Sequence, residues 1–212
     1  MNAALLATSL SLGFLFLRDK SAVLKHAATA TLQQSVAILF ERAERLLSGG
    51  DGVAVGEAVK ADAAEGDSSA GGPSALLHAC RFLLQDLVLV LGGLPTTWMK
   101  RGTAVPRVLA GDLVEYALRE HAPLFRALPS FHAIAGSLLV PLLLRQLPVQ
   151  LSFPLLLRLF RIARAFLFGL HTTLPAPTRA LLSLLIRMVH GAANGEVRIV
   201  SPSRVCRVTY AT

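Results

Sequence analysis

The sequence predicts an all-α fold of stacked helices, an α-solenoid of the armadillo or HEAT type. Of its 212 residues 53% are hydrophobic and only 6% aromatic, with Leu and Ala predominant, a composition that favours helices over strands. Apolar residues recur every three or four positions in several segments, as on one face of a helix. Gly and Pro fall between these segments, which is typical of stacked helical arrays. No repeat of fixed period is legible.

Residues 21–47 are the most regular segment and are predicted to form one long helix. The segment contains no Gly or Pro, Ser21 is the expected N-cap, and Gly49 and Gly50 follow its end. The residues expected to face the core share helical spacing and are Val23, Ala27, Ala30, Val36, Leu39, Phe40, Ala43 and Leu47.

Residues 1–17 are uncharged and are interpreted as the preceding helix, so that residues 1–48 form an N-terminal helical pair. A signal peptide is disfavoured because no basic region precedes the apolar run. A membrane span is disfavoured because about 17 residues is the lower limit for crossing a bilayer.

Residues 49–74 interrupt the helical pattern and are predicted to be a flexible insertion rich in Gly and acidic residues. They include no apolar residue larger than Val, so ordering them would bury too little surface to offset the entropy lost. Loop-closure entropy grows slowly with length, so the fold tolerates such an insertion between two helices.

Deletion of residues 52–70 is therefore expected to leave the thermal unfolding midpoint nearly unchanged. The midpoint is measured by circular dichroism, with the full-length chain as the reference. A decrease of several degrees would show that the insertion packs against the helices.

Residues 75–190 are predicted to continue the array. Helices are expected at 75–91, 106–120, 130–147, 152–170 and 178–190, with short Gly- or Pro-containing turns between them. The expected signals at helix ends and breaks are N-caps at Ser74 and Ser152, a stop at Gly92 and Gly93, a kink at Pro141, and a turn between Pro123 and Pro129. The tail, 191–212, is predicted to be irregular, either disordered or forming a short strand or hairpin.

A small integral membrane protein with several helices is the alternative fold. Residues 127–144 are uncharged and long enough to span a bilayer. However, this segment contains two prolines, and the next predicted helix has three arginines near its middle, where charge is costly in a membrane. We therefore favour an inner helix of the array for residues 127–144.

Positive charge is concentrated in the second half, where residues 121–212 include ten Arg and a single acidic residue, Glu196. Arginine suits acidic proteins, phosphates and lipid headgroups, although a GC-rich genome, which encodes Arg where another genome would encode Lys, gives the same excess. Arg158, Arg161 and Arg164 recur every three residues and are the candidate docking residues for an acidic partner or an anionic membrane. The alternative is the solvated face of an amphipathic helix.

The sequence predicts neither an enzyme nor a cofactor, metal or nucleic-acid site. No P-loop, dinucleotide fingerprint or nucleophile elbow is present, and no aromatic residues alternate with the bases. His78 and Cys80 are close in sequence but would point to different faces of a helix. Cys80 is interpreted as a core residue. Cys80 and Cys206 form no disulfide framework, which indicates a reducing compartment.

Two blocks of sequence carry a resemblance to a known family. The first is AATATLQQSVAILFERA at 27–43, preceded by FLRDKS. The second is LLQDLVLVLGGLPTTWM at 83–99, followed by a helix and by HAPLFRALPSF at 121–131. Both resemble the N-terminal region of the Mon-two family of Golgi–endosome scaffolds. In that family an aspartate-led helix, a Gly/Pro turn and a Trp follow in order, as do Asp86, Gly92-Gly93-Leu94-Pro95 and Trp98 here.

This resemblance implies a non-enzymatic scaffold or regulatory module in vesicle-mediated protein transport between the trans-Golgi network and endosomes. The family is related to the large Arf guanine-nucleotide exchange factors of the BIG type, but nothing here matches their catalytic Sec-seven domain. The matching part is the N-terminal dimerisation and regulatory region (DCB/HUS type), and the family's downstream asparagine–aspartate box is absent. The implied partners are a Dopey-type scaffold, Arf-like small GTPases and a second copy. The implied location is cytoplasmic, peripheral on Golgi, trans-Golgi network and endosome membranes.

Overall fold

The computed structural model describes residues 10, 12–17, 19–48, 73–99, 105–149, 151–193, 199–201 and 204–206. These residues are mostly helical, which confirms the all-α class. The helices are α2 (Ala22–Ser48), α4 (Pro73–Gly92), α5 (Arg107–Glu120), α6 (Ala122–Ala127), α7 (Pro129–Ala133), the π-helical segment η1 (Ile134–Leu139), α8 (Val140–Gln146), α9 (Phe153–Leu170) and α10 (Pro175–Ala193). Residues 12–16 are also helical. The predicted insertion lies outside the described residues up to residue 72.

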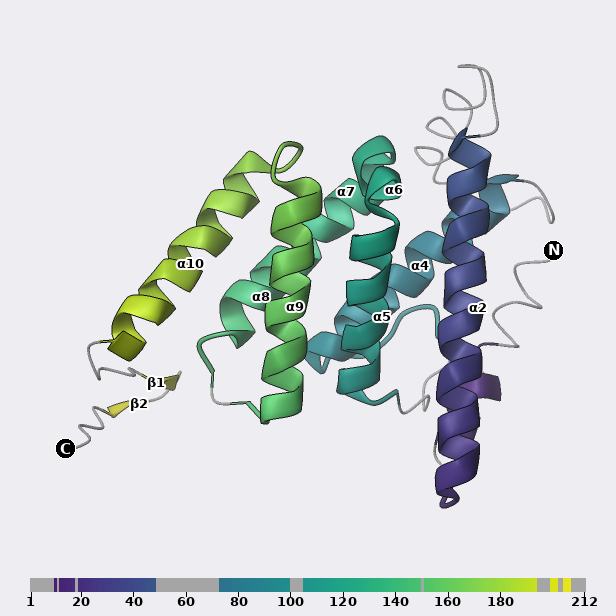
Figure 1. Ribbon diagram of the computed structural model, residues 1–212, viewed down its shortest axis with the longest axis horizontal. Coiled ribbons are helices and arrows are strands. Elements are labelled where there is room, and N and C mark those ends of the chain that lie inside the picture. The colour runs from purple at the N-terminus through teal and green to yellow at the C-terminus, as the bar shows by residue number, and fades with distance from the viewer. Residues whose placement is uncertain are drawn as a thin grey trace.

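The helices are arranged in two layers (Figure 1). In one layer α2, α5 and α9 lie side by side, followed by the tilted α10. Behind them α4 and the run α7–η1–α8 cross diagonally. The buried apolar side chains form one cluster that extends from Leu10 to Leu184. The two predicted helical parts of the chain, residues 1–48 and 75–190, therefore share one core. Helix α5 is central because it packs against α2, α4 and α9.

The predicted face of α2 is correct only in its C-terminal half. Val36, Leu39, Phe40 and Ala43 are buried there, as expected. In the N-terminal half Ala28 and Leu32 are buried instead of Ala27 and Ala30, and Val23 is 77% exposed. The N-terminal half packs against the preceding helical residues: a Cβ added to Gly13 would lie 2.7 Å from Leu32 Cδ2. The direction of that earlier segment therefore sets which residues are buried.

The stop predicted after α4 is confirmed. Gly93 has a φ of 73°, in the left-handed region that glycine adopts without steric cost. Its N–H donates to the Val90 carbonyl, and the Leu94 N–H donates to the Leu89 carbonyl, each at 2.9 Å. This pair of bonds is a Schellman motif, which satisfies carbonyls that a helix end leaves without donors.

Two predicted helix starts are wrong for the same reason. Helix α4 begins at Pro73, so Ser74 lies inside the helix instead of capping it. Helix α10 begins at Pro175 instead of residue 178. Proline is tolerated in the first helical turn, where its missing N–H would have no intrahelical acceptor. Ser152 does occupy the N-cap position of α9, with Pro154 in the first turn.

The irregularity predicted at Pro141 occurs just before it, as the π-helical segment η1. There the N–H of Val140 donates to the Ala135 carbonyl, five residues earlier. Pro141 has no N–H, and its ring would clash with the carbonyl four residues earlier in a regular α-helix. The region between Pro123 and Pro129, predicted as a turn, is the short helix α6.

The tail includes a hairpin, which is one of the predicted outcomes. Strand β1 (Ile199–Ser201) pairs antiparallel with β2 (Arg204–Cys206), and Val200 lies opposite Val205.

Within the described ranges, one helical segment is long and apolar enough to cross a membrane, Ala75–Gly92, with a mean hydropathy of 1.6. Half of that segment is buried inside the fold. Residues 127–144, considered above as a span, are divided among α6, α7, η1 and α8.

Candidate functional site

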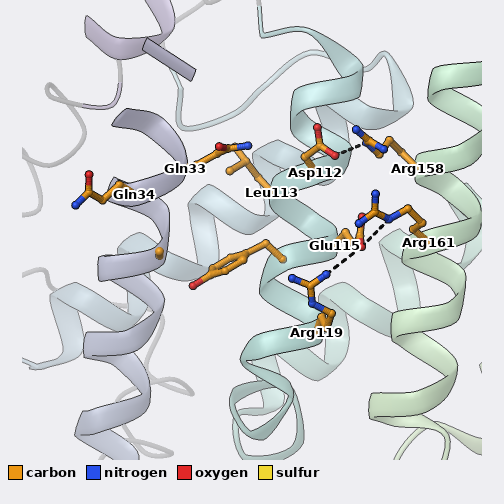
Figure 2. Close-up of a pocket in the computed structure, with 10 residues that line it drawn as sticks. Gln33, Gln34, Asp112, Leu113, Glu115, Arg119, Arg158 and Arg161 are labelled. Carbon is orange, nitrogen blue, oxygen red and sulfur yellow. Dashed lines mark hydrogen bonds and ion pairs between the residues drawn. The ribbon is translucent and has the colours of Figure 1, made fainter. Parts of the chain in front are cut away.

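A polar groove of about 500 Å³ lies where α2, α5 and α9 approach one another (Figure 2). Its lining residues are Gln33, Gln34 and Ala37 from α2, Asp112, Leu113, Glu115, Tyr116 and Arg119 from α5, and Arg158 and Arg161 from α9. Helix α5 supplies half of them because it lies between the other two helices (Figure 1). The packing of the helices therefore determines the shape of the groove.

Glu115 is the electrostatic centre of the groove. Arg161 Nε donates to Glu115 Oε1 over 2.9 Å, and Arg119 Nη1 lies 3.5 Å from the same oxygen. The Glu115 side chain is only 8% exposed, whereas Arg119 and Arg161 are 54% and 45% exposed. A buried carboxylate requires such partners, because an unpaired charge there would lose its hydration without compensation.

Asp112 and Arg158 form a second ion pair between α5 and α9 (Figure 2). Burial raises the pKa of Asp112, and the neighbouring Arg158 guanidinium opposes that rise only in part. The folded chain therefore holds this proton to higher pH than the unfolded chain does. As the pH increases through the titration of Asp112, its contribution to stability decreases.

The structure brings together two of the three predicted docking arginines. Arg158 and Arg161 line the groove and pair with carboxylates of α5. Arg164 is exposed, and its guanidinium lies 5.7 Å from the centre of the Phe168 ring on the same helix. The three side chains are therefore in different surroundings, and a docking role for all of them stays a prediction.

Sequence reasoning missed the α5 half of the groove. Asp112, Glu115 and Arg119 recur at intervals of three and four, which places them along one side of α5. The matching arginines follow about 46 residues later on α9, at the same kind of spacing. Charged residues on one side of an otherwise apolar helix were the available signal, but the sequence does not identify which helix faces them.

Asp86 explains the aspartate–glycine–tryptophan motif in structural terms. Its side chain is fully buried and accepts hydrogen bonds from the N–H groups of Thr97, Trp98 and Met99 at 2.8, 2.8 and 2.5 Å. The Thr97 hydroxyl donates to it as well, at 2.8 Å. The motif thus fastens the turn after α4 to the middle of α4. It forms a structural unit and presents no reactive group.

The contacts of His121 and Cys80 indicate that both residues support the fold. His121 Nδ1 lies 2.6 Å from Glu44 Oε2, and its ring stacks on Phe40, so it links α2 to the junction of α5 and α6. The predicted core position of Cys80 is confirmed: it is fully buried, and burial raises the pKa of its thiol. A protonated, buried thiol is a poor nucleophile.

Within the described ranges, no group of three or more His, Cys, Asp or Glu side chains is placed to hold a metal ion. No protein-family model, curated protein or solved structure matches the chain.

Proposed function

We propose that the chain is a non-enzymatic, armadillo-like scaffold or regulatory module in vesicle-mediated protein transport between the trans-Golgi network and endosomes. The observation that carries this proposal is the two-layer packing of α2, α4, α5, α9 and α10 around one continuous core (Figure 1). Stacked helices of this kind provide extended surfaces for partner proteins. The trafficking role comes from the Mon-two resemblance of residues 27–43 and 83–99.

The groove supports a binding role in preference to a catalytic one. Its buried carboxylate is already satisfied by Arg161 and Arg119, so it has no free base poised for proton transfer. Arg119 pairs with Glu120 as well, over 2.7 Å, so Arg161, which is 45% exposed, is the arginine at the rim that an acidic segment of a partner can reach. On the resemblance, that partner is a Dopey-type scaffold or an Arf-like small GTPase, with self-association through a second copy.

Peripheral attachment to Golgi, trans-Golgi network and endosome membranes is part of the proposal. Its support is the excess of arginine in the second half, together with the burial of half of Ala75–Gly92 inside the fold. The competing function is a small integral membrane protein, and its support is the apolar composition of that same segment.

Alkaline carbonate extraction of cell membranes distinguishes these two functions. The full-length tagged chain is expected to co-localise with trans-Golgi and endosome markers and to be released by carbonate, as a peripheral protein is. An integral membrane protein of known topology is the retained control. Retention of the chain in the membrane pellet would contradict peripheral attachment, and absence from both organelles would contradict the trafficking role.

A further inference from the structure

Helix α9 has a stripe of solvent-exposed apolar side chains on the side away from its buried residues. Its members recur at helical spacing on the side opposite the core and are Phe153, Leu157, Phe160, Arg164 and Phe168, here called the α9 stripe. Phe153 is 74% exposed and Phe168 77% exposed, while Leu157 and Phe160 are 40% and 38% exposed. The core-facing residues, such as Leu159 and Phe166, are fully buried on the other side.

The chain segment that contains the α9 stripe has charge of one sign only. No acidic residue occurs between residues 121 and 193. The arginines of that range without an ion pair to any described residue are Arg126, Arg145, Arg164, Arg179 and Arg187. On α5, Asp112 and Glu115 face α9, and both are already neutralised by Arg158 and Arg161. The α9 stripe thus belongs to a segment of the chain in which positive charge is in excess, and it includes one of the arginines without an ion pair, Arg164.

We propose that the α9 stripe is a membrane-contact surface for an anionic lipid leaflet. Phe153 and Phe168 enter the boundary between headgroups and acyl chains, and Arg164 pairs with lipid phosphates. This inference rests on the proposed peripheral scaffold and identifies the surface by which it attaches. It also separates Arg164 from Arg158 and Arg161, whose guanidinium groups instead hold α9 against α5.

The shape of the stripe favours a bilayer over a protein partner. From Phe153 to Phe168 the helix rises about 22 Å, at about 1.5 Å per residue, so the aromatic rings mark the two ends of a straight ridge. Aromatic residues that anchor protein complexes occupy well-packed pockets of the partner and are enclosed by further contacts. An amphipathic helix that lies in a membrane interface needs only an apolar ridge flanked by basic residues.

Flotation of the full-length chain with lipid vesicles tests the proposal. The chain is expected to float with phosphatidylcholine vesicles that contain phosphatidylserine, to float poorly with phosphatidylcholine alone, and to be released by salt. F153S/F168S is expected to weaken binding about tenfold or more, because two exposed rings no longer insert. R164E is expected to weaken it by about tenfold.

Matched variants on α2 are the controls. V23S/L24S removes two exposed apolar side chains, and R45E makes the same change of net charge as R164E at a side chain that is 77% exposed. Both are expected to float like the parent chain. Circular dichroism verifies that every variant keeps its helicity, which is expected because the replaced side chains are exposed.

An additional probe reports insertion directly. In the F168W variant the new indole is expected to be quenched by brominated lipid chains, whereas the parent chain, with Trp98 alone, is expected to show little quenching because Trp98 packs against the core. This readout distinguishes insertion of the ridge from general attraction of a basic protein.

The proposal is overturned if the parent chain does not float with anionic vesicles, if F153S/F168S floats as well as the parent, or if the two α2 controls lose binding equally. Binding of the stripe to a protein instead of lipid would appear as one of these negative results. If the chain reaches Golgi and endosome membranes but the stripe variants do so equally, only this inference fails. If vesicle binding follows the stripe but the chain reaches neither organelle, the proposed trafficking role fails and the inference holds.

Discussion

Replacement of Asp86 by alanine is expected to lower the free energy of unfolding by about 3–5 kcal/mol. The carboxylate is fully buried and accepts hydrogen bonds from three consecutive backbone N–H groups, those of Thr97, Trp98 and Met99. A hydrogen bond to a charged group contributes about 1.5–3 kcal/mol, and donors left unsatisfied in a buried turn cost more than the lost attraction alone. Chemical denaturation of the purified chain measures the difference.

Glu41→Ala is the control for Asp86→Ala. Glu41 is also an acidic residue on a helix, but it is 48% exposed and pairs with Arg45 on the same helix. Its removal is expected to cost less than about 0.5 kcal/mol, as for other surface pairs. If both variants lose similar stability, Asp86 does not fasten the turn after α4 in the way the structure indicates.

Replacement of Phe40 by alanine is expected to cost a similar amount, about 3–5 kcal/mol, for a different reason. Phe40 is fully buried, and its ring lies 5.7 Å from the His121 ring and 6.3 Å from the Phe131 ring. Truncation therefore leaves a cavity where α2 meets α7 and the start of α6, and it removes two aromatic contacts. The variant is expected to be degraded by protease much faster than the parent chain and to unfold at a lower temperature.

Ile38→Ala on the same helix provides the comparison for Phe40→Ala. Ile38 is 40% exposed, so its truncation removes apolar atoms without opening a closed cavity. We expect a cost of less than about 1 kcal/mol. Equal sensitivity of the two variants to protease would show that the C-terminal half of α2 faces the core differently from the structure.

The presence of the main helices could be predicted from the sequence because it depends on signals between residues that are close along the chain. The long helix at 21–47 and the stop at Gly92 and Gly93 follow from composition and from the backbone freedom of glycine. The starts at Pro73 and Pro175 were misjudged because proline both ends one helix and opens the next.

The buried face of α2 and the groove depend on residues distant in sequence. Leu32 is buried because Gly13 lies against it, and periodicity within α2 alone cannot reveal that neighbour. Likewise, Arg158 and Arg161 read as a free basic strip until α5 is placed beside them with Asp112 and Glu115. Pairing between helices is set by the packing of the whole fold, so local spacing shows the charges but not their partners.

The π-helical segment η1 changes the phase of the helical pattern in the sequence. Phe131 and Leu143 are twelve residues apart and would point about 120° from each other on an uninterrupted α-helix. Both are nevertheless fully buried. In a π-helical turn each N–H bonds to the carbonyl five residues earlier, so the turn contains about one residue more than an α-helical turn. One residue corresponds to about 100° of rotation around the helix axis. This offset nearly cancels the difference of about 120° and brings Leu143 back to the side of Phe131. The segment is equivalent to a one-residue insertion within a helix. The apolar residues before it and those after it each follow a regular helical spacing, but a single spacing applied across the whole segment fits neither set.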